Sequence, residues 1–176
     1  MNRSDTIAVE LNGVEKTLAA ESGEALVDVL RRNSHAVKVG CRNGDCGACT
    51  VLIDGTPIKS CLIPAQRVDG HQVVTLDGLS SEDELHPVQS SFLENNGFQC
   101  GFCLAGHVLC AVALLREKPN PTIAEVESSL AGNLCRCTGY EQIRTSVMRA
   151  AESMKHHCMS KHAAQYAPRE NSTPLE

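Results

Sequence analysis

A chain of 176 residues is long enough for one ordinary domain or two small ones. No stretch approaches the roughly 18 consecutive apolar residues of a membrane span, and the first residues lack an apolar export core, so we expect a cytoplasmic protein without membrane contact. Sixteen basic and twenty-one acidic residues give a net charge of −5. Because there is no basic block and there are few aromatic residues, nucleic acid is not an expected partner.

The pattern at the start of the chain is that of a β-hairpin. Apolar and more polar residues alternate along residues 7–11, and Asn12-Gly13 is a strong signal for a two-residue turn before residues 14–18. Ser22 is placed to cap a helix whose apolar face begins at Leu26. Further strands are predicted around a turn at residues 54–55 and over residues 72–76.

From about residue 80 the apolar period changes from two to 3.6, which predicts four helices. Pro87 suits the first turn of the first helix, and Gly97 can end it. The second helix follows the next cysteine pair. Thr122 and Glu125 form a capping-box signature for the third helix, and the fourth covers residues 143–154.

These patterns divide the chain into three parts. Residues 1–78 are predicted to form a small mixed sheet with one helix packed on it, and residues 79–158 an all-helical unit. Residues 159–176 are polar with two prolines, which is typical of a flexible tail. The predicted fold class is α+β.

The chain contains ten cysteines. In a reducing compartment, cysteines more often bind metal or react than form disulfides. Trp is absent and only three Phe and two Tyr occur, so bound metal can supply stability that small aliphatic cores lack.

The first cysteine group is a Gly-rich loop with a fourth cysteine farther on. Cys41, Cys46 and Cys49 have the C-x₄-C-x₂-C spacing that plant-type ferredoxins use for three ligands of a 2Fe–2S cluster. Glycines in this loop permit tight turns that aim backbone N–H groups at the sulfur atoms. Cys61 lies beyond the turn at residues 54–55, where the returning strand can bring it back to the loop.

Zinc is the alternative for this group, since it also takes four cysteines. Zinc sites usually pair their ligands as two C-x₂₋₄-C units, whereas here three ligands share one loop. A Rieske cluster needs two histidine ligands, and the sequence has no C-x-H pair. The spacing therefore favours a 2Fe–2S cluster.

The second group combines Cys100 and Cys103 with Cys135 and Cys137. Each pair is expected at the start of a helix, where free N–H groups and the helix dipole would stabilise an anionic cluster. By spacing alone, a second iron–sulfur cluster and a zinc site both remain open.

Three segments, residues 40–51, 99–103 and 132–140, resemble the small iron–sulfur subunit of molybdenum hydroxylases of the xanthine oxidase family. The resemblance runs from about Ile7 to Met154. It implies a plant-ferredoxin-like β-grasp domain followed by a four-helix bundle, with one 2Fe–2S cluster in each. It also implies a large subunit that holds molybdenum on a molybdopterin, often the cytosine dinucleotide, and a medium subunit that holds FAD, in a heterotrimer that can pair into a dimer.

The same resemblance implies roles for single residues. Gln99 and Cys137 match positions that approach the pterin, and Cys41, Cys46, Cys49 and Cys61 match the cluster nearer the flavin. One departure is the segment after Cys103, where Leu104 replaces the family's usual Thr or Ser and removes a hydroxyl group on the pterin side.

Two cysteines stand outside both groups. Cys110 falls on the apolar side of its predicted helix and is expected to be a small buried side chain. Cys158 lies close to the predicted tail, without an identifiable partner. Neither is expected to bind iron.

The chain has no nucleotide-binding fingerprint, so it is not expected to hold FAD or NAD itself. The expected function is to relay single electrons from the molybdenum centre to the flavin, as a subunit that is not catalytic alone. The alternative is a free two-cluster ferredoxin that exchanges electrons by transient collision.

Overall fold

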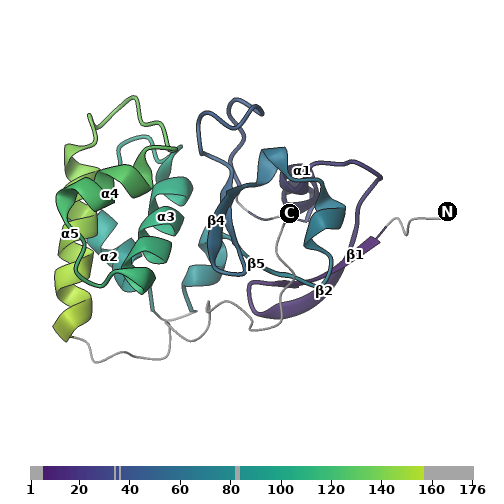
Figure 1. Ribbon diagram of the computed structural model, residues 1–176, viewed down its shortest axis with the longest axis horizontal. Helices are drawn as coiled ribbons and strands as arrows, with labels where there is room; N and C mark the ends of the chain where they lie inside the picture. Colours follow the sequence, from purple (N-terminus) through teal and green to yellow (C-terminus); the bar gives the residue numbers. More distant parts are fainter. Residues whose placement is uncertain (1–5, 34, 36, 82–83, 157–176) are drawn as a thin grey trace.

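The computed structural model describes residues 6–33, 35, 37–81 and 84–156. The predicted tail (159–176) lies outside these ranges, and so do Cys158 and residues 1–5. Along the described chain, a five-stranded mixed sheet with one helix comes first and four helices follow. Figure 1 shows the sheet and α1 at one end of the molecule and α2 to α5 at the other. The α+β architecture is the one predicted.

The sheet has the strand order β2-β1-β5-β3-β4. β1 and β5 run parallel, and the other neighbouring strands are antiparallel. The strands are β1 (Thr6–Leu11), β2 (Val14–Ala19), β3 (Thr50–Ile53), β4 (Thr56–Lys59) and β5 (Gln72–Val74).

Both predicted hairpins are confirmed. In the first turn, Asn12 and Gly13 have φ of 54° and 79°. In the second, Asp54 and Gly55 have φ of 46° and 76°. Two consecutive left-handed residues match the right-handed twist of the flanking strands, which is why Asn-Gly and Asp-Gly pairs favour this turn.

Helix α1 (Leu26–Arg32) does not begin as predicted. Ser22 lies in a preceding turn, and the residue before the helix is Ala25, which makes no side-chain cap. The first helical N–H, that of Leu26, instead donates to the carbonyl oxygen of Ile63 at 2.8 Å. A distant segment therefore provides the acceptor that a capping side chain would otherwise supply.

The helical part contains α2 (Pro87–Glu94), α3 (Leu104–Glu117), α4 (Ile123–Leu130) and α5 (Glu141–His156). The Thr122 and Glu125 capping box at α4 is confirmed. Helix α2 begins at Pro87 as predicted, but its left-handed end residue is Asn96, with φ of 53°, one position before Gly97. The N–H of Gly97 then donates to the carbonyl oxygen of Phe92 at 2.8 Å, which closes a Schellman motif.

Two buried clusters form the core. One joins the inner face of β1 and α1 through residues such as Val9, Val29 and Leu30. The other joins the helices α2 to α5, and it also includes Leu52 of β3 and Val74 of β5. The central strands are thus covered on both faces, so the helical part packs directly against the sheet.

None of the helices among the described residues is both long and apolar enough to cross a bilayer.

Candidate metal centres

The first cysteine loop connects α1 to β3 and folds back on itself. Arg42, Gly44 and Gly47 have φ of 61°, 89° and 69°. These left-handed residues turn backbone N–H groups toward sulfur: Cys46 N lies 3.3 Å from Cys41 Sγ, and Cys41 N lies 3.5 Å from Cys46 Sγ. Such N–H groups stabilise negative charge on the sulfur atoms.

Cys61 joins this loop from a short 3₁₀ helix, Ser60–Leu62, that follows β4. The hydroxyl group and the N–H of Ser60 both donate to the carbonyl oxygen of Cys49, at 2.6 and 3.4 Å. The thiol groups of Cys61 and Cys49 are in contact. The loop and the returning segment therefore bring together two thiol pairs, Cys41 with Cys46 and Cys49 with Cys61.

The thiols of this group differ in their surroundings. Backbone N–H groups of Cys46 and Asn43 lower the pKa of Cys41 to about 6. Burial raises the pKa of Cys61. The exposed Cys41 thiol thus receives the stronger hydrogen bonding from backbone N–H groups, whereas the Cys61 thiol is partly shielded from water.

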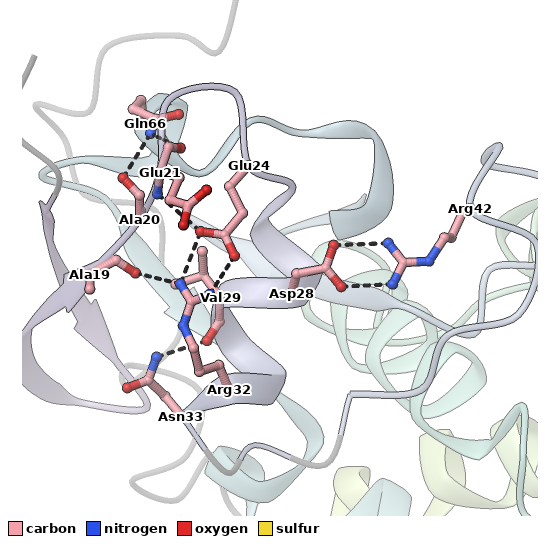
Figure 2. A network of polar contacts seen from close by, with 10 residues as sticks. All are labelled: Ala19, Ala20, Glu21, Glu24, Asp28, Val29, Arg32, Asn33, Arg42 and Gln66. Carbon is pink, nitrogen blue, oxygen red and sulfur yellow. Dashed lines mark hydrogen bonds and ion pairs between the residues drawn. The ribbon is translucent and has the colours of Figure 1, made fainter.

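An ion pair attaches the loop to α1. Figure 2 shows Arg42 reaching Asp28 with two parallel hydrogen bonds, both of 2.8 Å. The guanidinium group of Arg42 holds the pKa of Asp28 below its usual value. The same figure shows a second two-point pair, between Arg32 and Glu24, on another side of α1.

The second group is built from the segment before α3 and the loop between α4 and α5. Cys103 is the residue that precedes the first turn of α3, as predicted. Cys135 and Cys137 do not stand at a helix start, because α5 begins only at Glu141. Left-handed Gly139 and Tyr140, with φ of 61° and 69°, separate them from the helix, so among the described helices α3 alone begins directly after a cysteine of this group.

These four thiols also form two pairs. The sulfur atoms of Cys100 and Cys137 are 3.6 Å apart. Cys103 and Cys135 are in contact through their thiol groups. The Cys103 thiol is buried, and burial raises its pKa to about 12. The Cys100 thiol is exposed, and the N–H of Phe102 lowers its pKa.

Polar groups hold the Cys135 segment. Thr138 Oγ1 lies 3.2 Å from Cys135 Sγ, and the N–H of Cys135 donates to Tyr140 Oη at 2.9 Å. Burial alone would raise the pKa of Cys135, but the hydroxyl and N–H groups of Thr138 lower it. Cys137 has a raised pKa because of the neighbouring Cys100 thiol.

Gln99 and Cys137 lie together at the exposed rim of this group. Gln99 Nε2 donates to the carbonyl oxygen of Cys137 at 3.3 Å. Both side chains are exposed, so they are open to a partner molecule on this side.

The number and pairing of the thiols decide which metal group they can hold. A 2Fe–2S cluster requires four thiolates, two for each iron, whereas a zinc ion requires four around one point. In the described part of the chain, no three His, Cys, Asp or Glu side chains gather as one metal ion would need. The paired thiols and converging N–H groups fit two clusters of two irons.

Sequence reasoning did not identify two buried polar residues between and behind these groups. Asn133 lies where the two cysteine loops meet. The sequence feature that could have indicated it is its position between Gly132 and Cys135. His107 is fully buried, and its Nδ1 lies 2.9 Å from the carbonyl oxygen of Cys103. A carbonyl oxygen can only accept, so Nδ1–H is the donor in this bond, and burial lowers the pKa of His107 below its ordinary value.

Comparison with known proteins gives two family matches. Residues 9–76 match the family described as 2Fe-2S iron-sulfur cluster binding domain. Residues 75–148 match the family described as 2Fe-2S binding domain.

Whole-chain relatives cover most of the sequence. The small subunit of nicotine 6-hydroxylase from Paenarthrobacter nicotinovorans is 44% identical over 82% of this chain and 88% of its own length. The iron-sulfur-binding subunit of xanthine dehydrogenase from Escherichia coli O157:H7 is 45% identical over 84% of this chain and 96% of its own. A chain of quinoline 2-oxidoreductase from Pseudomonas putida 86 matches with a TM-score of 0.82 and 39% identity, covering 87% of this chain and 98% of that one. The protein belongs to the family of iron–sulfur small subunits of molybdenum hydroxylases.

Proposed function

We propose that this chain passes electrons one at a time between a molybdopterin-bound molybdenum centre in a large partner subunit and FAD in a medium partner subunit. Cys41, Cys46, Cys49 and Cys61 would hold one 2Fe–2S cluster, and Cys100, Cys103, Cys135 and Cys137 a second. When bound, such clusters exchange single electrons, which divides a two-electron oxidation into one-electron steps. The observation that carries the proposal is the presence of two quartets of paired thiols in one chain.

A direct backbone contact joins the two quartets. The N–H of Leu134 donates to the carbonyl oxygen of Cys46 at 2.9 Å. Leu134 precedes Cys135, so this hydrogen bond connects a ligand of each proposed cluster through few covalent bonds. It supports a relay within the chain, because it joins the backbones of the two cysteine segments directly.

The direction of the relay rests on the family resemblance, in which Gln99 and Cys137 match positions that approach the pterin, and the exposed rim agrees with it. Gln99 and Cys137 are proposed to face the pterin, since both are exposed and hydrogen bonded to each other beside the second quartet. The pterin in the large subunit is proposed to be the cytosine dinucleotide form. The first quartet would then face the flavin-binding subunit. The substrate would be chosen by the large subunit.

Exposed apolar side chains stand next to cysteines of both quartets in the sequence. Leu62, Phe102 and Leu134 are 55%, 45% and 55% exposed. Phe102 and Leu134 are neighbours of cysteines of the second quartet, and Leu62 follows Cys61. A subunit that lost its partners would leave such apolar surface open, whereas a free shuttle needs a charged docking face. This favours the subunit over a free ferredoxin.

The remaining parts of the proposal concern organisation. A β-grasp unit would end near residue 78, and a four-helix bundle would follow it; each would hold most of one buried cluster, with Leu52 and Val74 of the sheet joining the helical one. The complex would be a heterotrimer, able to pair into a dimer, in the cytoplasm.

Metal content and rapid kinetics of the assembled complex test the proposal. We expect about four irons and four acid-labile sulfides per chain, with two distinct paramagnetic resonance signals after reduction. In Cys49→Ser, substrate should still reduce molybdenum and the second cluster, but the flavin should stay oxidised far longer. In Cys103→Ser, electrons should remain at molybdenum. The control Cys110→Ala should keep all of its iron.

Zinc in place of iron, or a single cluster signal in the wild-type complex, would refute the two-cluster assignment. A normal rate of flavin reduction in Cys49→Ser would refute the path through the first quartet.

A further inference from the structure

The side chain of Asn133 occupies the place where three segments of the protein meet. It is only 3% exposed although it carries a polar amide group. Around it lie the first cysteine loop, the first turns of α3, and its own loop between α4 and α5. Burial of an amide is unfavourable unless both of its ends find partners.

Each end of the Asn133 amide contacts a different part of the molecule. Nδ2 donates to the thiol sulfur of Cys110, on α3, at 3.1 Å. Oδ1 accepts from the hydroxyl group of Thr50, on β3, at 3.4 Å. This hydroxyl group has a single proton, which it shares between Asn133 Oδ1 and the closer carbonyl oxygen of Gly47 in the first cysteine loop, at 2.7 Å. One side chain therefore connects the sheet, a helix and the second cysteine loop.

Two glycines leave the space that the amide fills. A Cβ atom at Gly47 would lie 2.2 Å from Asn133 Oδ1, and one at Gly106 would lie 2.4 Å from the same atom. The Cβ at Gly106 would also lie 2.4 Å from the carbonyl oxygen of Gly47. No side chain fits at either position, so the backbones of the two cysteine segments approach each other directly around the amide oxygen.

All three segments carry cysteines of the two quartets. Gly47 stands between Cys46 and Cys49, Gly106 follows Cys103 in the first turn of α3, and Asn133 precedes Cys135. We propose that Asn133 is a positioning residue that fixes the two cysteine quartets relative to each other and thereby sets the rate of electron transfer between them. This inference rests on the proposed function, since it takes both quartets to be cluster ligands.

Other contacts keep the two parts together when Asn133 is changed. Arg116, near the C-terminal end of α3, donates to the carbonyl oxygen of Gly55 at 3.0 Å. Leu52 and Val74 of the sheet are packed within the helical core. Loss of the Asn133 contacts should therefore alter the geometry at the cysteine end of the interface without separating sheet and helices.

The experiment compares variants of the assembled complex. Asn133→Leu keeps a similar volume and removes both hydrogen bonds. Cys110→Val removes only the acceptor of the amide, and Cys110→Ser restores a polar partner. Asn95→Leu is the matched control, because the Asn95 amide also makes two hydrogen bonds, to the carbonyl oxygen of Ser91 at 2.8 Å and its hydroxyl group at 3.2 Å, but at the end of α2.

Three quantities are measured: iron content, the magnetic interaction between the two reduced clusters by paramagnetic resonance, and the electron-transfer rate from the second cluster to the first after rapid mixing with substrate. We expect full iron content in all variants. Asn133→Leu should slow transfer between the clusters by about tenfold, the order found when residues that orient metal ligands are removed, and should change their magnetic interaction. Cys110→Val should show a smaller change in the same direction, and Cys110→Ser should recover the wild-type values.

A purely structural role predicts a different result, in which Asn133→Leu and Asn95→Leu lower stability but leave the rate and the magnetic interaction unchanged. That result overturns the inference. If Asn133→Leu does not fold, an unchanged rate in Cys110→Val overturns it instead. A wild-type complex without two cluster signals would refute the proposed function and this inference together, whereas two signals with unchanged transfer refute the inference alone.

Discussion

Arg42 and Asp28 form one of two similar ion pairs on α1, and only this pair contacts a cysteine loop. The Arg42 side chain is 52% exposed, and that of Arg32, which pairs with Glu24, is 49% exposed. Exposed pairs contribute little to overall stability because water and salt screen them. The Arg42 pair can still matter locally, since Arg42 has a left-handed backbone and lies next to Cys41.

Arg42→Lys should weaken the hold on the first cysteine loop, because a lysine ammonium group cannot make two parallel hydrogen bonds to one carboxylate. We expect faster loss of iron from the first site in the presence of a chelator, with the second site unaffected. Visible absorption and paramagnetic resonance follow the two sites separately. Arg32→Lys, which removes a two-point pair with a similarly exposed arginine away from the loop, should not accelerate iron loss. Equal loss in both variants would contradict a local role for Arg42.

At the scale of single elements, α4 shows how a helix start depends on charge. Lys118 and Thr122 lower the pKa of Glu125 from its ordinary 4.5 to about 2. The carboxylate accepts hydrogen bonds from Lys118 Nζ at 2.6 Å and from the N–H of Thr122 at 2.8 Å. A carboxylate near a helix N-terminus is also favoured by the helix dipole.

Because the folded-state pKa of Glu125 is lowered, its contribution to stability is present above about pH 4.5 and is lost as the pH falls toward about 2. Glu125→Gln keeps an acceptor for Thr122 but not the charge. We expect this variant to be less stable than wild type in urea at neutral pH, and the difference to shrink as the pH falls through this range. Lys118→Gln should show the same trend. The double variant should lose less free energy of unfolding than the two single variants lose together. A difference independent of pH would contradict the charge argument.

At the scale of the whole molecule, the two cores share the sheet. Val51 and Ile53 face the core around α1, whereas Leu52, between them on β3, belongs to the helical core. The alternation of side chains along a strand places neighbours on opposite faces. A change in the sheet can therefore destabilise the helices directly.

Leu52→Ala should destabilise the protein by about 2–5 kcal/mol, because it removes a fully buried side chain and leaves a cavity. We expect amide hydrogen exchange to become faster in α3 and its neighbours. Val51→Ala, on the other face of the same strand, should accelerate exchange mainly in the first sheet strands and α1. If both variants accelerate hydrogen exchange at the same amides, the two cores are not destabilised independently.

The sequence by itself determined the local features of this protein. The turns at Asn12-Gly13 and Asp54-Gly55 and the capping box at Thr122 each depend on a few adjacent residues, so local chemistry is sufficient to predict them. The resemblance of three separate segments, residues 40–51, 99–103 and 132–140, was similarly sufficient to indicate the family, which the relatives confirm.

The tertiary structure decided the features that depend on distant segments. The start of α1 moved away from Ser22 because the carbonyl oxygen of Ile63 accepts its first N–H. Leu52 joined the helical core because α3 covers the second face of the sheet. Asn133 became a junction because Gly47 and Gly106 come together only in the folded chain. Contacts between residues far apart in the sequence leave no local pattern, so only the packing of sheet against helices could reveal them.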